Sequence, residues 1–577
     1  MMDNKDLEAE IHPLKNEDRT SQENLGNRTE KEDPCKSLPP QSQLSRCRTV
    51  AFFLSLFICL FVVFVVSFII PCPDRPVSQQ MWRINYDTAV TYDFLAMKDI
   101  NRDRIQDILF LYKNANSSNN FNLSCADEGF SSPCTFAAAV SGANGSLLWE
   151  RPVAQDVTVM QCTGPQQRAS GALSACVLVG GPGSVIAVDP FTGETLWSHP
   201  GSLGRNVSIL SLLLGVPDVN NDGLPDLLVL TREEKEVNGY VYSGSTGSQV
   251  GRKGSLGTDG EGGSLLHVTR TGAHYLLFPC AHSLCGWSMK SLFEEMTGKE
   301  SLLKKDPLWE RAINATTHRV SSPRLICMLV SATICPDWRW GKPRVQWSSS
   351  GAIRYQMHVP GRAGNDLLLV GSEACVLLDG QDLAPRWTLG NTQVFRKPVL
   401  GHYKPDTLSV VIENGTGINR QILLLDLSTG VILWHQPLPG FPGGPPSANL
   451  PTADHRSAFF FWGLPEGVGA NQTETRNTPH SLYMFHPTLP SILLELANIS
   501  TNIVAFEAIL FEPSRHAAYI LLTGPESPAE PGLVSVTKHK VRDHIPDSRV
   551  VHLGQDRADS DQAIRDRFSR LRYQSEA

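Results

Sequence analysis

Residues 218–226 carry oxygen-bearing side chains at alternating positions in the sequence DVNNDGLPD. The loop would offer oxygen ligands from Asp218, Asn220, Asp222 and Asp226 at positions 1, 3, 5 and 9, and from the carbonyl of Leu224 at position 7. Ca²⁺ prefers six to eight such oxygens, and Gly223 at position 6 permits the sharp turn. A strand-like LLVL follows in place of a helix, and position 12 is not Glu, which disfavours an EF-hand. The loop predicts a structural calcium site; the alternative is an Asx-turn with solvated carboxylates.

A second loop has the same spacing of oxygen-bearing residues. Its ligands would come from Asp99, Asn101, Asp103 and Asp107. Arg104 stands where the first loop has Gly, which brings a strained backbone and a positive charge near the site. We therefore predict weaker metal binding here. In a third segment, Gly364 to Val370, only Asp366 and the following strand persist, and we expect a structural role.

Motifs for catalysis are missing from the sequence. It has no G-x-S-x-G, H-E-x-x-H, G-x-G-x-x-G or G-x-x-x-x-G-K-[ST] segment, and its 16 histidines have no metal-ligand spacing. The formal net charge of −7 gives no basic footprint for nucleic acid. We expect a protein that is not an enzyme and binds no organic cofactor and no nucleic acid.

An uncharged segment at residues 50–70, VAFFLSLFICLFVVFVVSFII, is long enough to cross a bilayer as one helix. Arg46 and Arg48 precede it, and fewer basic residues follow, so the positive-inside rule predicts a cytoplasmic N-terminus. The polar residues 1–49 are expected to form a disordered cytoplasmic tail. The sequence thus predicts a single-pass type II membrane protein that contacts lipid through 50–70, at the cell surface or in the secretory pathway.

Two features agree with an extracytosolic C-terminal region. Eight N-x-[ST] glycosylation motifs follow the span, at Asn116, Asn122, Asn144, Asn206, Asn314, Asn414, Asn471 and Asn498. Neighbouring cysteines suggest short-range disulfides, although connectivity does not follow from sequence: Cys125 with Cys134, Cys162 with Cys176, Cys280 with Cys285, and Cys327 with Cys335. Cys375 is expected to be a buried free thiol, and Cys72 is a candidate for an intermolecular bridge in a dimer.

Hairpins recur along the C-terminal region, each with two alternating strands, a Gly-containing turn and often a final Trp. Examples are AAAVSGANGSLLW (137–149), VIAVDPFTGETLW (185–197) and ILLLDLSTGVILW (422–434). Gly145, Gly193 and Gly247 lie 48 and 54 residues apart, and a weaker turn at Gly298 follows after 51. A four-stranded propeller blade takes about 40–50 residues. The pattern predicts an all-β propeller of seven or eight blades, with the Trp residues in its core.

The domain boundaries follow from these patterns. We expect a juxtamembrane stalk at 71–91, a propeller at 92–545 with a poorly packed insertion at 321–350, and a C-terminal tail at 546–577. In the tail, Ile564, Phe568 and Leu571 have the spacing of a short amphipathic helix.

The loops and hairpins resemble features of known protein families. The D-x-N-x-D-G-x-x-D loops resemble the calcium-binding loops of FG-GAP repeats in integrin α-subunits, and the hairpins at 188–197 and 425–434 are similar to quinoprotein-like blades. Together with the membrane span, they resemble the integrin-α FG-GAP repeat-containing type II membrane family. That likeness implies calcium ligation by the five residues of the 218–226 loop, and it implies no established activity.

The favoured function is a glycosylated surface module whose calcium-stabilised propeller binds another protein. A secretory-pathway scaffold or cargo-binding protein is the alternative, and a quinoprotein-like enzyme is less favoured. The partner, an extracellular or luminal protein, does not follow from the sequence.

Overall fold

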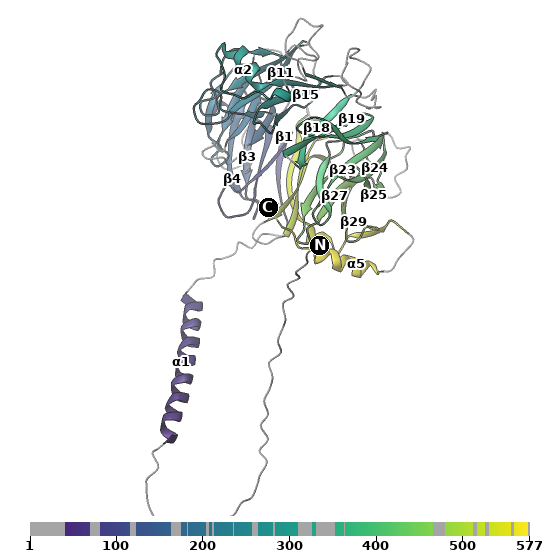
Figure 1. Cartoon of the computed structure of the whole chain (residues 1–577). Coiled ribbons are helices and arrows are strands. Elements are labelled where there is room, and N and C mark those ends of the chain that lie inside the picture. The colour runs from purple at the N-terminus through teal and green to yellow at the C-terminus, as the bar shows by residue number, and fades with distance from the viewer. Residues whose placement is uncertain are drawn as a thin grey trace, which may run out of the picture. The chain divides into compact units, whose positions relative to one another are not determined.

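The structure is a computed structural model of the whole chain (Figure 1). It describes residues 41–69, 81–115, 123–162, 175–181, 183–203, 207–210, 213–234, 236–256, 263–280, 283–309, 326–329, 352–362, 364–441, 443–465, 479–511, 516–525, 530–554 and 559–574. The chain divides into two compact units, Met1–Arg75 and Pro76–Ala577.

The first unit contains one long helix, α1 (Gln41–Ile69). Its stretch from Arg48 to Val65 is long and apolar enough to cross a membrane, and none of this stretch is buried. The helix begins at Gln41, nine residues earlier than the predicted span. Residues 41–49, predicted as part of a disordered tail, are therefore helical, because no Pro or Gly follows Pro40 before the apolar stretch. The rest of the predicted tail lies outside the described residues.

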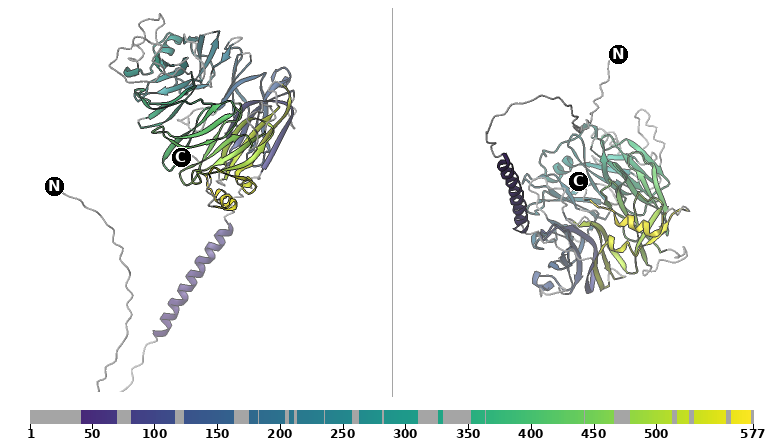
Figure 2. Two further views of the ribbon diagram at one scale, coloured as in Figure 1. Left: turned by 90° about the vertical axis from the view of Figure 1, so that its right-hand side faces the viewer. Right: turned by 90° about the horizontal axis from the view of Figure 1, so that it is seen from below.

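The second unit is built of antiparallel sheets, mostly four-stranded meanders (Figure 2). The first strands, up to the third sheet, are β1 (Met81–Lys98), β2 (Asp107–Asn114), β3 (Cys134–Val140), β4 (Leu147–Ala154), β5 (Val157–Cys162), β6 (Cys176–Gly180), β7 (Ser184–Val188), β8 (Thr195–His199), β9 (Ser208–Ile209), β10 (Leu214–Val216), β11 (Asp226–Glu233), β12 (Glu236–Tyr242) and β13 (Gly254–Ser255).

The middle of the chain continues the series with β14 (Leu265–Val268), β15 (His274–Cys280), β16 (Ser283–Ser288), β17 (Ile326–Leu329), β18 (Ile353–Gly361), β19 (Gly364–Gly371), β20 (Ala374–Leu378), β21 (Pro385–Gly390), β22 (Val399–Lys404), β23 (Thr407–Thr416), β24 (Asn419–Asp426) and β25 (Ile432–Pro437). The last strands are β26 (Ala448–Pro451), β27 (Ser457–Gly463), β28 (His480–Phe485), β29 (Ile492–Ile499), β30 (Asn502–Phe511), β31 (His516–Gly524), β32 (Gly532–Lys540) and β33 (Arg549–His552). Short helices interrupt them: η1 (Cys125–Glu128), α2 (Met289–Thr297), α4 (Val541–His544) and α5 (Asp561–Ser569).

The predicted Trp-terminated hairpins join neighbouring sheets. Trp149 of β4 is 8% exposed, lies against Gly193 in the β7–β8 turn, and donates its indole N–H to the carbonyl of Pro190 at 3.1 Å. The turn needs glycine because Gly193 has φ +72° and a Cβ there would lie 2.5 Å from the indole. The same contact is made by Trp82 on Gly145, Trp197 on Gly247 and Trp387 on Gly430. The prediction that the hairpin Trp residues belong to the core is confirmed for Trp149, whereas Trp197 and Trp387 are half-buried and pack against the core.

Strand β1 brings the two ends of the second unit together (Figure 1). Its first half pairs with β32, with Met81 opposite His539, and its second half pairs with β2, with Lys98 opposite Asp107. The predicted stalk at 71–91 is therefore wrong from Met81 onward, since those residues form a strand of the propeller.

Three other expectations need correction. The insertion predicted at 321–350 contains β17, which pairs with β16; its remaining residues lie outside the described part of the chain. Gly298 ends helix α2 and is not a hairpin turn. The predicted C-terminal tail is folded, because β33 pairs with β29. Its amphipathic helix is confirmed as α5, with Ile564 and Phe568 1% and 2% exposed, but Leu571 lies two residues beyond the end of the helix.

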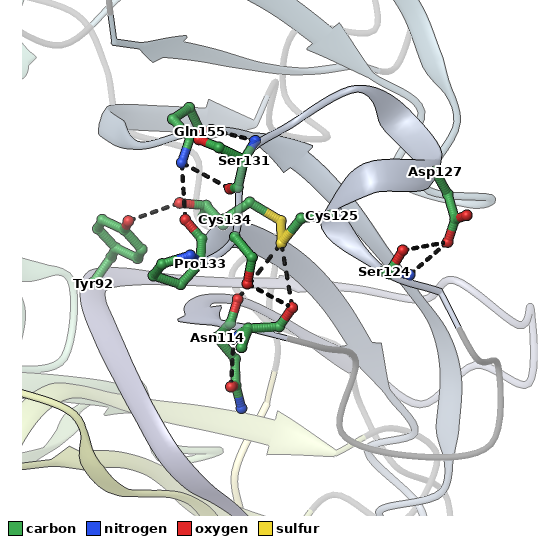
Figure 3. Close-up of a disulfide and its surroundings, with 12 residues drawn as sticks. Tyr92, Asn114, Ser124, Cys125, Asp127, Ser131, Pro133, Cys134 and Gln155 are labelled. Atoms are coloured by element: carbon green, nitrogen blue, oxygen red, sulfur yellow. Dashed lines mark hydrogen bonds between the residues drawn. A yellow bond between two sulfur atoms is a disulfide. The ribbon is translucent and has the colours of Figure 1, made fainter.

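Two of the predicted disulfides form, Cys125–Cys134 and Cys162–Cys176. Figure 3 shows the first of them beside Gln155, which donates to the carbonyls of Ser131 and Pro133 at 3.0 and 2.8 Å. Cys375 is buried and free, as predicted.

The other cysteine predictions concern residues whose positions or side chains lie outside what the structure describes. Cys335, the predicted partner of Cys327, lies outside the described residues, so the predicted disulfide of Cys335 stays a prediction. The register of β16 and β17 instead places Cys327 opposite Cys285, a neighbour that the sequence reasoning had assigned to Cys280. The side chains of Cys280, Cys285 and Cys327 are not described, and Cys72 lies outside the described residues as well.

Candidate metal centre

The 218–226 loop connects β10 to β11 and folds around the carboxylate of Asp218. Asp218 Oδ1 accepts the backbone N–H of Asn221 at 2.7 Å, and its Oδ2 accepts that of Gly223 at 2.8 Å. Gly223 has φ +90°, a conformation that favours glycine. Asn220 Oδ1 accepts the backbone N–H of Asp222 at 2.9 Å. The motif spacing therefore produces a compact loop in which side chains close back on the backbone.

Asp226 holds the loop to the neighbouring turn. It is 1% exposed, and its oxygens accept the backbone N–H groups of Val219 at 2.9 Å and Gly244 at 3.2 Å. Burial raises the pKa of this carboxyl, and hydrogen bonds from the backbone of Val219, Gly244 and Asn220 oppose that rise.

Asp222 is exposed and faces the β12–β13 turn. Ser245 Oγ donates to Asp222 Oδ2 at 2.6 Å, and Ser243 Oγ donates to the same oxygen at 2.8 Å. The hydrogen bond from Ser245, supported by that from Ser243, holds the pKa of Asp222 well below its ordinary value. The carboxylate is therefore ionised at neutral pH.

The three acidic groups Asp218, Asp222 and Asp226 offer ligand oxygens within 4.8 Å of one another. Within the described ranges, no Lys or Arg forms an ion pair with any of them. Carboxylates gathered this closely repel one another unless a cation or a proton compensates them. The donor set, all oxygen and rich in negative charge, fits a hard cation such as Ca²⁺.

The weaker loop, between β1 and β2, has nearly the same hydrogen bonds. Asp99 Oδ2 accepts the N–H of Arg104 at 3.0 Å, Asn101 Oδ1 accepts that of Asp103 at 3.0 Å, and Asp107 Oδ1 accepts that of Gly142 at 3.0 Å. Arg104 adopts the strained φ of +68° that we expected for this position. Among the described residues, only the 218–226 loop brings three acidic groups together closely enough for a metal.

The third segment, Gly364 to Val370, shows the structural role of the final Asp of each loop. Asp366 Oδ1 accepts the N–H of Gly380 at 3.1 Å, just as Asp107 and Asp226 accept from Gly142 and Gly244. Arg386 lies 3.1 Å from the other oxygen of Asp366. The last Asp is thus a structural link between two turns of one sheet, whether or not a metal binds.

Ser243 and Ser245 were missed by the sequence reasoning. They lie about 20 residues after the loop, in the turn of the next hairpin, and their sequence SGSTG matches an ordinary Gly-containing turn. A comparison of the two repeats could have found Ser245. The β3–β4 turn beside the weaker loop reads SGANG and has Ala143 where the β12–β13 turn has Ser245.

The asparagines of the glycosylation motifs differ in solvent exposure. Asn144 and Asn498 are exposed, on the β3–β4 turn and on β29. Asn414 is half-buried, and its Oδ1 accepts the N–H of Gln393 at 2.6 Å. The other motifs, at Asn116, Asn122, Asn206, Asn314 and Asn471, lie outside the described residues.

The sheets of the second unit form a β-propeller, which is its fold class. A family model described as the FAM234A/B β-propeller matches residues 82–333 and 338–574, so the chain belongs to that family. The human protein FAM234A is 68% identical over 577 residues, and the mouse protein FAM234A is 66% identical over 579, each alignment covering both chains completely. Chicken protein FAM234B is 27% identical over 513 residues, covering 85% of this chain and 77% of its own length.

Solved structures resemble the fold only distantly. The WD40 domain of SCAP from fission yeast has a TM-score of 0.41 at 10% identity, covering 79% of this chain and 98% of that one. BamB from Moraxella catarrhalis has a TM-score of 0.37 at 12% identity, covering 80% and 99%. The predicted kinship with integrin-α FG-GAP repeats stays a prediction beside the family match.

Removal of calcium tests the site. We expect chelation to lower the stability of the full chain in detergent by about 0.6–1.8 kcal/mol relative to 2 mM Ca²⁺, for a dissociation constant of about 10⁻⁴–10⁻³ M. Differential scanning fluorimetry with and without EGTA measures the change. Asp222→Asn should abolish the response, while the matched variant Asp103→Asn in the weaker loop should keep it. A wild-type melting temperature that is indifferent to EGTA would exclude calcium from the account.

Proposed function

We propose that this chain is a non-catalytic, glycosylated type II membrane protein whose calcium-stabilised propeller of eight blades binds another protein outside the cytosol. The observation that carries the proposal is the combination of an uncovered apolar helix with a disulfide-bonded propeller in the same chain.

Membrane insertion is supported by the surface of α1. Its apolar side chains are exposed all round the helix, from Val50 at 64% to Phe64 at 61%. A helix that is hydrophobic on every face needs an apolar environment, and lipid supplies it. The length of the apolar stretch suits a single crossing.

The orientation is supported by the cysteines. Disulfides persist in oxidising compartments and are rare in the cytosol. Cys125–Cys134 and Cys162–Cys176 both lie in the second unit, C-terminal to α1. Arg46 and Arg48, N-terminal to the apolar stretch, favour a cytosolic N-terminus by the positive-inside rule.

The blade count rests on the seven-stranded sheet β30-β31-β32-β1-β2-β3-β4. Because β1 pairs with β32 through its first half and with β2 through its second, this sheet divides into two four-stranded blades that share β1. The six other sheets then bring the proposed count to eight.

Binding outside the cytosol is favoured over catalysis by the roles of the polar groups. The acidic loops link turns to one another, and the docked Trp side chains tie neighbouring sheets together. Such a scaffold presents loops at the two ends of its strands, as interaction propellers do.

Surface biotinylation combined with glycosidase digestion tests where the protein acts. We expect a biotinylated chain with glycans resistant to endoglycosidase H, as at the cell surface. Glycans that stay sensitive, on a chain protected from biotin, would favour the secretory-pathway scaffold instead. Proximity labelling from a C-terminal fusion should then enrich extracellular or luminal proteins; labelling of cytosolic proteins would contradict the proposal.

A further inference from the structure

Two histidines meet between the β14–β17 sheet and the β18–β21 sheet. His267 of β14 is fully buried, and its Nδ1 lies 3.2 Å from Nε2 of the half-buried His358 of β18. His267 Nε2 lies 2.7 Å from the carbonyl oxygen of Gly380, in the β20–β21 turn. Because a carbonyl only accepts, His267 Nε2 carries a proton, and Nδ1 of the neutral ring accepts from His358 Nε2–H. The neutral pair satisfies both contacts.

The pair supports Trp309, which follows α2 and is 2% exposed. The indole stacks on His267 with ring centroids 5.1 Å apart and on Tyr275 at 4.8 Å. Its N–H donates to the carbonyl of Gln381 at 2.9 Å, in the same turn as Gly380. Trp309 thus docks on the turn of the next sheet, as the strand-borne Trp residues do elsewhere, although it lies in a helical turn at 307–309 and not on a strand.

Charged groups around the pair are already engaged. Asp366 of β19, which faces His267, accepts from Gly380 and is paired with Arg386 of β21 at 3.1 Å. Arg386 also binds Asp379 of the β20–β21 turn at 2.6 Å. Beyond Trp309, Asp306 accepts from Thr271 Oγ1 at 2.8 Å and its backbone N–H donates to Tyr275 Oη at 3.1 Å. Asp366 therefore favours a proton on His267 and opposes the effect of burial, but it shares Arg386 with Asp379.

We propose that His267 and His358 form a pH-sensitive latch that holds Trp309 and the two sheets together at neutral pH and releases them in an acidic compartment. A proton on His267 Nδ1 would face the proton on His358 Nε2, and one added charge would have to be buried against Trp309. A second proton would place two positive rings 3.2 Å apart. The inference concerns regulation and does not depend on the calcium site.

The direction of the effect follows from linkage. Burial lowers the pKa of His267, and burial together with the neighbouring ring lowers the pKa of His358 to about 4, from an ordinary value near 6.5. The opened state therefore binds protons more readily than the closed state. The latch is complete above about pH 6.5 and weakens as the pH falls from there toward 4.

Hydrogen exchange measured by mass spectrometry tests the latch on the full chain in detergent. We compare pH 7.4 with pH 5.5, after correction for the intrinsic exchange rate, in peptides covering 265–268, 306–309 and 356–359. One linked histidine should raise the opening equilibrium about tenfold at pH 5.5. The β3 segment 134–140, which contains no histidine, should change less than twofold and serves as the internal control.

Variants assign the response to the pair. Gln at both positions keeps amide donors and acceptors but does not titrate, so the double variant His267→Gln/His358→Gln should respond less than twofold. If the double variant fails to fold, the single variant His358→Gln, which leaves the fully buried His267 unchanged, provides the test. Its response to acid should be smaller than that of the wild type. His539→Gln alters a similar histidine pair, His539 and His544 at 3.1 Å, and should leave the tenfold response at 306–309 intact. A full response in His358→Gln, or equal acid-induced exchange in β3, would overturn the proposal.

Discussion

Replacement of Trp82 by Ala is expected to destabilise the propeller by about 3–5 kcal/mol, because a large buried side chain is removed from the strand that joins its two ends. Trp82 is 6% exposed, lies against Gly145, and donates its indole N–H to the carbonyl of Gly142 at 3.3 Å. Its neighbour in register on β32 is Lys538, so the indole links β32 to the β3–β4 hairpin. The melting temperature of the full chain in detergent measures the loss.

Trp82→Phe is the matched control. It keeps most of the aromatic area but loses the hydrogen bond, so we expect a loss of about 1 kcal/mol. If Trp82→Ala melted like the wild type, Trp82 would belong to a stalk, as the sequence had suggested, and not to the closing strand.

Replacement of Glu413 by Ala should have an effect of similar size, about 3–5 kcal/mol, for an electrostatic reason. Glu413 of β23 lies 2.6 Å from Arg420 and 3.1 Å from Arg396, and it accepts from Ser447 Oγ at 2.5 Å. Glu413 and Arg420 are each 4% exposed. Without the carboxylate, the buried guanidinium of Arg420 loses this ion pair and remains close to the guanidinium of Arg396.

Glu233→Ala provides the comparison for Glu413→Ala. Glu233 pairs with Lys253 at 2.6 Å, but both side chains are partly exposed, at 32% and 52%. Solvent screens such a pair, and its loss should cost at most about 1 kcal/mol. Equal thermal shifts in the two variants would mean that the Glu413 cluster is not buried as the structure has it.

The sequence predicted those parts of the fold that depend on contacts within one hairpin or one loop. The turns at Gly193 and Gly430 were predictable because glycine at positive φ and the alternating strands around it lie within one hairpin. The conformation of the 218–226 loop was predictable for the same reason, since Asp218 and Gly223 interact over five residues.

Contacts between distant parts of the chain could not be predicted. The pairing of β1 with β32 joins residues more than 440 positions apart, and nothing local marks Met81–Tyr86 as a strand with that partner. Trp309 docks like the other Trp residues without a hairpin of its own, because a helical turn at 307–309 carries it instead of a strand. In the same way, Ser243 and Ser245 contact Asp222 of the candidate metal site only because the fold brings two turns together.

Cysteine pairing shows the same division between local and distant contacts. Cys125 and Cys134 are nine residues apart, and their disulfide was predictable from that proximity. Proximity in sequence also suggested Cys335 for Cys327, yet the residue opposite Cys327 in the sheet is Cys285, 42 positions away, because β17 pairs with β16.

Peptide mapping of the full chain purified from cells, without reduction, tests most directly whether the propeller lies outside the cytosol. We expect Cys125 linked to Cys134, Cys162 linked to Cys176, and an N-glycan on the exposed Asn498. Reduced cysteines at all four positions, together with unmodified Asn144 and Asn498, would contradict it.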